Sequence, residues 1–373
     1  MPLSIFIDAL PHSEIEKCYS SWFKSMQFAI LKPNIAYSSC LHWQLYCNKY
    51  PDERKKFVDW LKINENDDKV IKYANLFRPL DNFTFASFCV RKIFNKYILK
   101  NNSFAFIPFK FRKLFSNQAQ YLFWDKNVYS KEENFKDYLV ISQDENKKTF
   151  EKTFVEALEQ IKNSKKIFIN FGFADYIGHR CARGAEYDKR LKPYMERVKE
   201  IIQKYLEYYP NEEVIIMSDH GMSTINKKIN INLEKRFGKQ SESTYIAYMD
   251  SCIMCVWSKD MNLLRKIKNY LETINYGHML TEEERVYYKA TDRLFGDIIF
   301  NLREGYVFKN SWFGQSKRRN KFGEGMHGFW PELEAVDQMA VIISINSNRQ
   351  LKKVYDYSDA YKLVSSIMGG KCE

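Results

Sequence analysis

The stretch that decides the fold is VIIMSDHG, residues 214–221, in which an apolar run leads directly into an acidic residue and a histidine. A short apolar run of this kind is typical of a strand buried on both faces, as in a parallel sheet. Runs of the same character occur at Ser4–Ile7, Lys166–Phe171 and Ala340–Ile345. We therefore predict that these four segments are core strands of one parallel sheet.

Helical patterns lie between the predicted strands. Thr149–Lys162 and Tyr187–Tyr208 have the apolar spacing of amphipathic helices, and Pro210 ends the second. Because strand and helix alternate, we expect an α/β fold with a mostly parallel central sheet flanked by helices. Two stretches, at about 52–135 and 223–325, do not alternate in this way. We interpret them as lobes inserted into a single domain that spans the chain.

Charge and cysteine usage limit the classes of function. The formal net charge is +12, from 58 basic and 46 acidic residues, and a basic surface attracts anions. The charge is spread along the chain rather than gathered in a tail, so a small anionic substrate is favoured over nucleic acid. The eight cysteines follow no disulfide framework, and we interpret Cys252 and Cys255 as buried structural residues.

The expected location is the cytoplasm. The N-terminal segment lacks the charged and long apolar regions of a signal peptide, and free thiols are typical of a reducing compartment. No stretch approaches the roughly 18 apolar residues of a spanning helix. The sequence does not indicate an oligomeric state.

Three carboxylates stand where predicted strands end. Asp8 ends the first, Asp175 follows the second, and Asp219 follows the third. Open α/β sheets bind ligands beyond the carboxyl ends of their strands, so these side chains should gather at one edge. Crowded carboxylates repel one another unless cations lie between them. The pattern therefore predicts a metal centre.

Three of the six histidines accompany these carboxylates. His179 is four residues after Asp175, His220 follows Asp219, and His327 stands between glycines in GMHG. Mixed imidazole and carboxylate ligands favour zinc, then manganese or iron. Six ligands suit two divalent ions about 3.5–4 Å apart, as in two-metal phosphoryl-transfer sites.

Four motifs in this order carry a family resemblance: FIDALP from residue 6, ADYIGH from 174, MSDHGM from 217 and MHGF from 326. They resemble the metal-binding motifs of the type I phosphodiesterase/nucleotide pyrophosphatase family of the alkaline phosphatase superfamily. The similarity covers roughly residues 1–52, 136–222 and 326–368. It implies an alkaline phosphatase-like fold, a catalytic domain and phosphoester chemistry.

The resemblance also implies a nucleophile. In the family a Thr or Ser lies thirteen residues before the Pro of a YP-[DE] motif, and counting back from Pro51 reaches Ser38. A hydroxyl bound to a metal loses its proton near neutral pH, which suits this role. Ser39 is the second candidate. Cys40 is a weak candidate for a sulfatase-type nucleophile because CLHWQ lacks the C-x-P-x-R pattern.

The family pattern divides the ligands into two sets. It implies Asp8, Ser38, Asp219 and His220 for one ion, and Asp175, His179 and His327 for the other.

The chain departs from the family pattern at two places. Position 41, a Leu here, holds an Asn in family pyrophosphatases, and Cys47-Asn48 stands where the family has Thr-Gly. Both departures weigh against nucleotide pyrophosphatase activity in particular.

The expected activity is phosphoester hydrolysis through a phosphoseryl intermediate, on a nucleotide, nucleotide sugar or glycan phosphate. Phosphomonoesterase, phosphotransferase, phosphomutase and sulfatase activity remain alternatives. A different class is an inactive protein that binds an anionic ligand or nucleic acid.

Four cations precede His327 closely: Lys317, Arg318, Arg319 and Lys321. Arg318 and Arg319 are candidate substrate-binding residues, although a solvated basic loop is the simpler interpretation. Of the remaining histidines, His42 is expected to make a structural hydrogen bond. His12 and His278 belong to no pattern of partner residues, and we interpret them as surface or loop residues.

Overall fold

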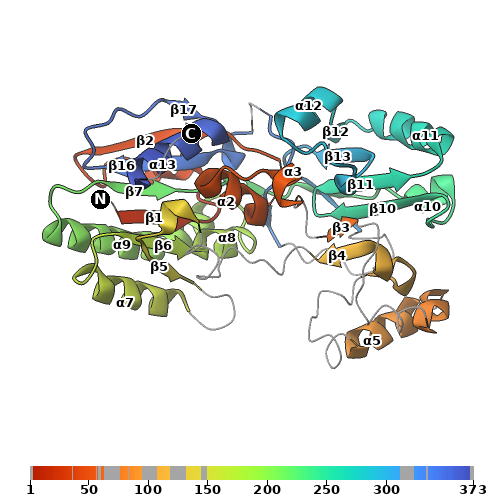
Figure 1. The fold of residues 1–373 in the computed structure, drawn as a ribbon, viewed down its shortest axis with the longest axis horizontal. Coiled ribbons are helices and arrows are strands. Elements are labelled where there is room, and N and C mark those ends of the chain that lie inside the picture. The colour runs from red at the N-terminus through yellow and green to blue at the C-terminus, as the bar shows by residue number, and fades with distance from the viewer. Residues whose placement is uncertain are drawn as a thin grey trace. The chain divides into compact units, whose positions relative to one another are not determined.

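The computed structural model describes residues 3–35, 37–55, 57, 60–62, 76–82, 84–94, 107–117, 132–143, 149–310, 323–332 and 335–369. The chain divides into two compact units (Figure 1). The first comprises Met1–Tyr50, Tyr121–Asn226 and Phe322–Glu373, and the second comprises Pro51–Gln120 and Lys227–Lys321. That residues 52–135 and 223–325 are lobes inserted into one domain stays a prediction.

A seven-stranded sheet forms the centre of the first unit, in the order β17-β2-β16-β7-β1-β6-β5. The strands β7, β1, β6 and β5 are parallel to one another, whereas β16 is antiparallel to both of its neighbours. The mostly parallel α/β sheet predicted from the sequence is therefore confirmed. The strands are β1 (Leu3–Ile7), β2 (Met26–Leu31), β5 (Leu139–Ser142), β6 (Ile167–Phe171), β7 (Val214–Met217), β16 (Ala340–Ile345) and β17 (Val354–Tyr355).

The direction of β16 corrects the prediction that Ala340–Ile345 is a parallel strand. Ile342 pairs with Met217, the last residue of β7, so β16 begins at the edge where β7 ends. Only a short 3₁₀ helix, Val336–Gln338, lies between that edge and β16. A parallel strand would need a crossover of a dozen or more residues to return to the opposite end of the sheet.

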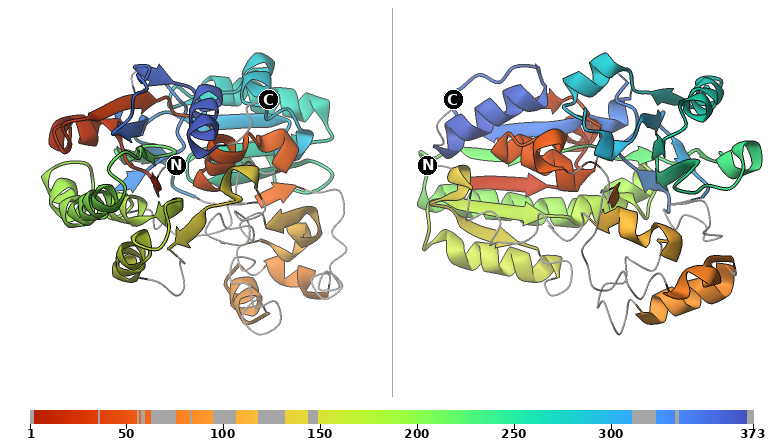
Figure 2. Two further views of the ribbon diagram at one scale, coloured as in Figure 1. Left: turned by 60° about the vertical axis from the view of Figure 1, so that its left-hand side comes forward. Right: turned by 45° about the vertical axis from the view of Figure 1, so that its right-hand side comes forward.

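Helices cover both faces of this sheet (Figures 1 and 2). On one face lie α7 (Phe150–Ile161) and α9 (Ala185–Tyr208), close to the two helices predicted from the sequence. Thr149 caps α7 by accepting a hydrogen bond from the Lys152 amide. On the other face lie α2 (Ser38–Cys47) and α13 (Tyr357–Met368).

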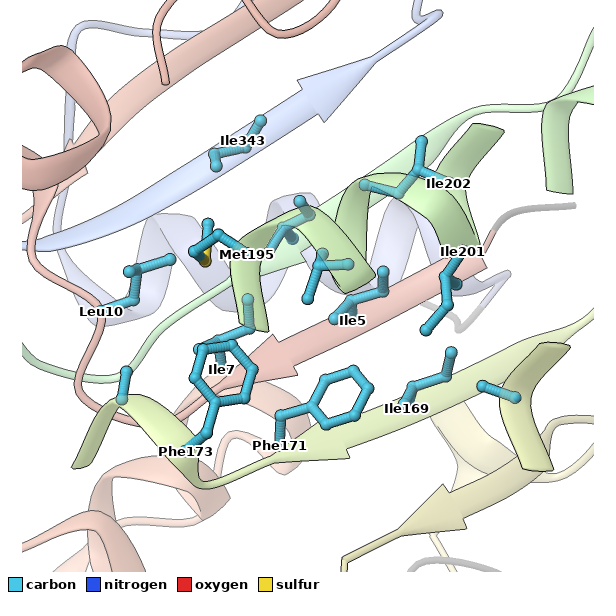
Figure 3. Close-up of a cluster of buried hydrophobic side chains, with 14 of the residues drawn as sticks. Ile5, Ile7, Leu10, Ile169, Phe171, Phe173, Met195, Ile201, Ile202 and Ile343 are labelled. Carbon is cyan, nitrogen blue, oxygen red and sulfur yellow. The ribbon is translucent and has the colours of Figure 1, made fainter. Parts of the chain in front are cut away.

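The main core lies between α9 and the sheet (Figure 3). Ile5 and Ile169 project from neighbouring strands toward Met195, Ile201 and Ile202 of α9, and all five are fully buried. Burial of each such side chain contributes about 1.5–3 kcal/mol. This packing fixes the strands whose ends carry the predicted ligands.

The second unit contains a four-stranded antiparallel sheet in the order β10-β11-β13-β12. Cys252 and Cys255 are fully buried there, as predicted for structural cysteines. In the ranges given above, no helix combines the length and the apolar character of a membrane crossing. The principal elements are α3 (Pro51–Arg54), β3 (Trp60–Lys62), α5 (Thr84–Phe94), β4 (Phe115–Asn117), β9 (Lys227–Ile229), α10 (Leu233–Phe237), β10 (Tyr245–Asp250), β11 (Ile253–Ser258), α11 (Met261–Glu272), β12 (Gly277–Met279), α12 (Glu282–Tyr287), β13 (Ile298–Leu302) and β14 (Tyr306–Phe308).

Candidate metal centre

The three predicted carboxylates meet at the carboxyl edge of the parallel strands. Asp8 directly follows β1, and its amide donates a hydrogen bond of 2.9 Å to the Phe171 carbonyl at the end of β6. Asp219 comes two residues after β7. Asp175 lies in the first turn of α8 (Phe173–Gly178), and its amide donates to the Asp8 carbonyl at 3.1 Å. The backbone therefore ties two of the carboxylates together directly.

One group of candidate ligands comprises Asp8, Asp219 and His220, which the structure brings together in the protein interior. Nε2 of His220 lies 3.3 Å from Oδ2 of Asp219 and 3.5 Å from Oδ1 of Asp8. Ser38, at the start of α2, belongs to the same cluster. Its hydroxyl oxygen is 2.8 Å from His220 Nε2 and 3.3 Å from Asp8 Oδ1.

A second group comprises Asp175, His179 and His327. Asp175 Oδ1 lies 3.1 Å from His179 Nε2 and 3.5 Å from His327 Nε2. The two groups adjoin each other, because the rings of His220 and His327 stack with centroids 3.7 Å apart. The structure thus brings together all seven residues of the predicted metal centre, in the two sets that the family pattern implies.

Backbone carbonyls orient two of the imidazoles. Nδ1 of His179 donates to the Gly325 carbonyl at 3.0 Å, and Nδ1 of His220 donates to the Gly221 carbonyl at 2.8 Å. A carbonyl only accepts, so the proton of each neutral ring lies on Nδ1 and the Nε2 lone pair faces the carboxylates. Metal-ligating histidines are held in this way in most proteins.

Glycines allow the backbone segments around the second group to approach closely. A Cβ atom on Gly325 would lie 2.2 Å from the Gly178 carbonyl oxygen, and one on Gly323 would lie 2.3 Å from the His179 carbonyl oxygen. Gly325 belongs to β15 (Gly325–Met326), which pairs with β8 (Ser223–Thr224). Any side chain at Gly325 would push this short ladder, and His327 with it, away from α8.

Burial and mutual repulsion perturb the carboxyl groups. Burial, followed by the charges of Asp219 and Asp175, raises the pKa of Asp8 well above its usual value, and burial also raises the pKa of Asp219. Burial acts in the same direction on Asp175, but its contacts with His179 outweigh this and lower its pKa. Burial opposes protonation of His179, yet the Asp175 charge raises its pKa above the ordinary value.

These residues fit two divalent cations. Oδ2 of Asp219 is buried and has no hydrogen-bond donor among the described residues, and the Nε2 lone pair of neutral His220 faces it at 3.3 Å. Two electron-rich atoms at this separation repel each other. A cation between them would remove the repulsion and give the buried oxygen a partner. The nitrogen and oxygen donors of both groups suit zinc or manganese.

The other predicted residues lie apart from the two groups or cannot be placed. The Ser39 side chain and the cations Lys317, Arg318, Arg319 and Lys321 lie outside the described residues. His42 is buried with its ring 4.6 Å from that of Phe6, and burial lowers its pKa well below the usual value. This packing agrees with a structural role.

The structure places His12 and His278, which were expected at the surface or in loops, in regular secondary structure with each side chain partly exposed. His278 lies in strand β12 rather than in a loop, and its Nε2 is 2.8 Å from Oε2 of Glu284. His12 begins α1 (His12–Cys18), and its half-buried ring is 5.5 Å from that of Phe28. Both positions depend on tertiary packing, which an isolated histidine in a sequence does not reveal.

Sequence reasoning missed two supporting residues. The Ser218 hydroxyl accepts from the Leu10 amide at 2.8 Å and donates to the His220 carbonyl at 2.9 Å, which joins the two loops of the first group. The Tyr357 hydroxyl donates to the carbonyl of Asp219. Ser218 could have been found from its place in SDHG, whereas nothing in the sequence links Tyr357 to a loop so distant in the chain.

Solved structures share this fold at low sequence identity. Murine ectonucleotide pyrophosphatase/phosphodiesterase 5, as an inactive variant in complex with AMP, aligns with a TM-score of 0.62 at 13% identity, covering 99% of this chain and 95% of that chain. The human protein of the same name aligns with a TM-score of 0.62 at 12% identity, covering 100% and 96%. At this identity the likeness shows the fold alone.

Sequence comparison gives the family. No curated protein sequence matches the chain. The profile of the type I phosphodiesterase/nucleotide pyrophosphatase family matches residues 116–330, more than half of the 373 residues. That segment contains five of the seven clustered residues: Asp175, His179, Asp219, His220 and His327. The chain belongs to the type I phosphodiesterase/nucleotide pyrophosphatase family, within the alkaline phosphatase superfamily.

Proposed function

We propose that this chain hydrolyses phosphodiester or pyrophosphate bonds, with Ser38 as the nucleophile and two divalent cations, zinc first and manganese second, as cofactors. The observation that carries the proposal is the position of the Ser38 hydroxyl, 2.8 Å from His220 Nε2 and 3.3 Å from Asp8 Oδ1. A nucleophile must lie among the groups that activate it, and the Ser38 hydroxyl lies inside the first ligand group.

The two groups of ligands would divide the ions as the family pattern implies. Asp8, Ser38, Asp219 and His220 would hold one ion, while Asp175, His179 and His327 would hold the other. When bound, such ions lower the pKa of a hydroxyl and offset charge on phosphoryl oxygens.

Ser38 would then attack phosphorus in line with the leaving oxygen. The new bond joins Oγ to phosphorus, the bond to the leaving oxygen breaks, and the serine proton is released. Hydrolysis of this phosphoseryl intermediate by water returns the free hydroxyl. In the structure the Ser38 hydroxyl donates to Asp8 Oδ1 and lies 2.8 Å from His220 Nε2. An ion held by these three atoms would displace both contacts.

A nucleotide is the favoured substrate class. One structural neighbour is described in complex with AMP, and the net charge of +12 suits an anionic substrate. The buried Leu41 gives no side-chain amide at the position that holds Asn in family pyrophosphatases. We therefore favour a phosphodiester substrate over a nucleotide pyrophosphate.

The test compares substrates on the full chain loaded with zinc or manganese. Bis-p-nitrophenyl phosphate should be hydrolysed faster than p-nitrophenyl phosphate or p-nitrophenyl sulfate, and dinucleotide pyrophosphates should reveal pyrophosphatase activity. Chelation should abolish turnover, and added zinc or manganese should restore it. A faster monoester would assign a phosphomonoesterase instead. No turnover of any ester by metal-loaded protein would favour an inactive anion-binding protein.

A further inference from the structure

The second unit contains a cavity of about 510 Å³ between α11, β12 and the start of α12. This volume lies within the range of roughly 300–1,000 Å³ that is usual for ligand pockets. The apolar part of its lining is formed by Leu271, Ile274, Met279, Leu280 and Phe300. None of the clustered metal-centre residues lines it.

The rim of this cavity is acidic in a chain that is basic overall. Glu272, Glu282 and Glu283 line it together with Lys268, and all four side chains are exposed. The His278 imidazole also lines the cavity, with its Nε2 2.8 Å from Oε2 of Glu284. Three carboxylates against one ammonium leave a local charge of about −2, opposite to the formal net charge of +12. Such a rim attracts cationic groups and repels the phosphoester class proposed for the metal centre.

The strand beside the cavity is an edge strand. In the described residues β12 pairs with β13 alone, at the end of the sheet. The amide of Leu280 donates to Ile299, and the Tyr276 carbonyl accepts from Arg303. Because antiparallel residues alternate, the main-chain groups of Gly277 and Met279 point away from β13. These two residues also line the cavity.

Gly277 lets the Phe300 ring lie directly against the backbone of β12. A Cβ atom there would lie 2.3 Å from the Phe300 ring, so the aromatic floor packs directly against the bare backbone of the strand. An extended segment approaching β12 would therefore meet an apolar floor, an acidic rim and main-chain groups that pair with no other described strand, all at one place.

We propose that the edge of β12 and this cavity bind an extended basic segment of a partner protein by strand addition. Main-chain hydrogen bonds to Gly277 and Met279 would give the pairing, and a Lys or Arg side chain would reach the glutamates while an apolar neighbour fills the cavity. Charge complementarity selects this occupant over an acidic peptide. The proposal does not depend on the activity of the metal centre.

The test uses the full chain and a fluorescein-labelled heptapeptide in which valine alternates with lysine, measured by fluorescence anisotropy. The matched peptide has glutamate in place of each lysine. We expect the lysine peptide to bind at least about tenfold more tightly, with an affinity that falls as salt rises. A Glu282→Gln, Glu283→Gln double variant should lose about tenfold in affinity, whereas Glu159→Gln, an exposed position in the first unit, should change nothing.

A second peptide separates strand addition from plain charge attraction. N-methylation of alternate amides removes donors without changing charge, so it should abolish binding if the peptide pairs with β12. Equal binding of the lysine and glutamate peptides, or full binding by the methylated one, would overturn the proposal. So would a lysine peptide that binds the double variant as well as the wild type. Concentration-dependent self-association that the lysine peptide does not displace, seen by sedimentation, would assign the edge to a second copy of this chain instead.

Discussion

The Ser38 hydroxyl and Nε2 of His220 lie 2.8 Å apart although 182 residues separate them in the chain. Ser38 begins α2, and His220 follows β7, so the contact exists only because α2 begins at the edge of the sheet where β7 ends. The same Nε2 lies 3.3 Å from Asp219 and 3.5 Å from Asp8. The hydroxyl thus shares its surroundings with every ligand of the first group.

Ser38→Ala is expected to lower turnover by at least about a thousandfold while most bound metal is retained. The substitution removes the attacking oxygen but leaves Asp8, Asp219 and His220 in place. Steady-state kinetics and elemental analysis of the purified variant measure the two effects. Ser39→Ala is the matched control and should keep its activity. If Ser39→Ala is inactive and Ser38→Ala is active, the nucleophile is the neighbouring serine.

The two ions are expected to be separable by mutation. His220→Ala should weaken metal binding to the first group, and His327→Ala should weaken binding to the second. Each loss should exceed the roughly 10–100-fold that removal of an outer-shell partner costs, because a direct ligand disappears. The metal content of each variant after dialysis measures the two losses. Two variants that both keep two ions per chain would refute the assignment of ligands.

Gly325→Ala is expected to destabilise the fold by about 1–3 kcal/mol and to impair the second group of ligands. Its Cβ would meet the backbone oxygen of Gly178 at 2.2 Å, which no side-chain movement relieves. Gly178→Ala offers a matched comparison, because its Cβ would meet the Met222 side chain at 2.5 Å. Met222→Ala should therefore rescue Gly178→Ala but not Gly325→Ala. Denaturant unfolding and metal content measure both effects.

Above about pH 7, the metal-free protein is expected to lose stability as the pH rises. The Asp175 charge raises the pKa of His179 above its ordinary 6.5, so the folded chain holds this proton more tightly than the unfolded chain. The contribution of this proton to the free energy of unfolding is fully present below pH 6.5. It disappears as the pH rises through the folded-state pKa of His179. The pKa values of His42 and His327 are lowered by burial, so in this range both are neutral in folded and unfolded chains.

Melting temperatures in the presence of a chelator, between about pH 7 and 9, measure this slope. His179→Gln should flatten it, since glutamine has no proton to lose. His42→Gln is the control, and the slope should persist in that variant whatever its overall stability. An equal slope in wild-type and His179→Gln protein would show that the Asp175–His179 pair does not control this titration.

The ligands could be predicted because each follows a dense apolar run. Asp8 comes directly after β1 and Asp219 two residues after β7. All residues of these two strands are fully buried, and burial on both faces gives a strand its continuous apolar pattern. Strand β2, at Met26–Leu31, is half-buried along most of its length and its pattern was correspondingly weak. It was missed for that reason. The two-residue β17 is too short to give a pattern, and β5 was missed although most of it is buried.

The direction of β16 and the hydrogen bonds that support the ligand loops could not be predicted. The direction of β16 depends on the edge from which the chain arrives, and a local apolar pattern is the same in either direction. The hydrogen bond from Tyr357 to the Asp219 carbonyl joins residues whose proximity is decided by the packing of α13. The nucleophile was predicted from family spacing, and the residues around Ser38 alone did not single it out from Ser39.

The position of β16 between β7 and β2 bears on how the protein matures during synthesis. On a ribosome, β1, β6 and β7 emerge and can pair long before Ala340–Ile345 is made, whereas β2 must wait for its partner. His327, the last ligand, also emerges late. The first ligand group is therefore complete once His220 has been made, whereas the second is complete only when translation is nearly finished. Metal availability at that moment, rather than earlier in synthesis, would set the fraction of chains that become loaded.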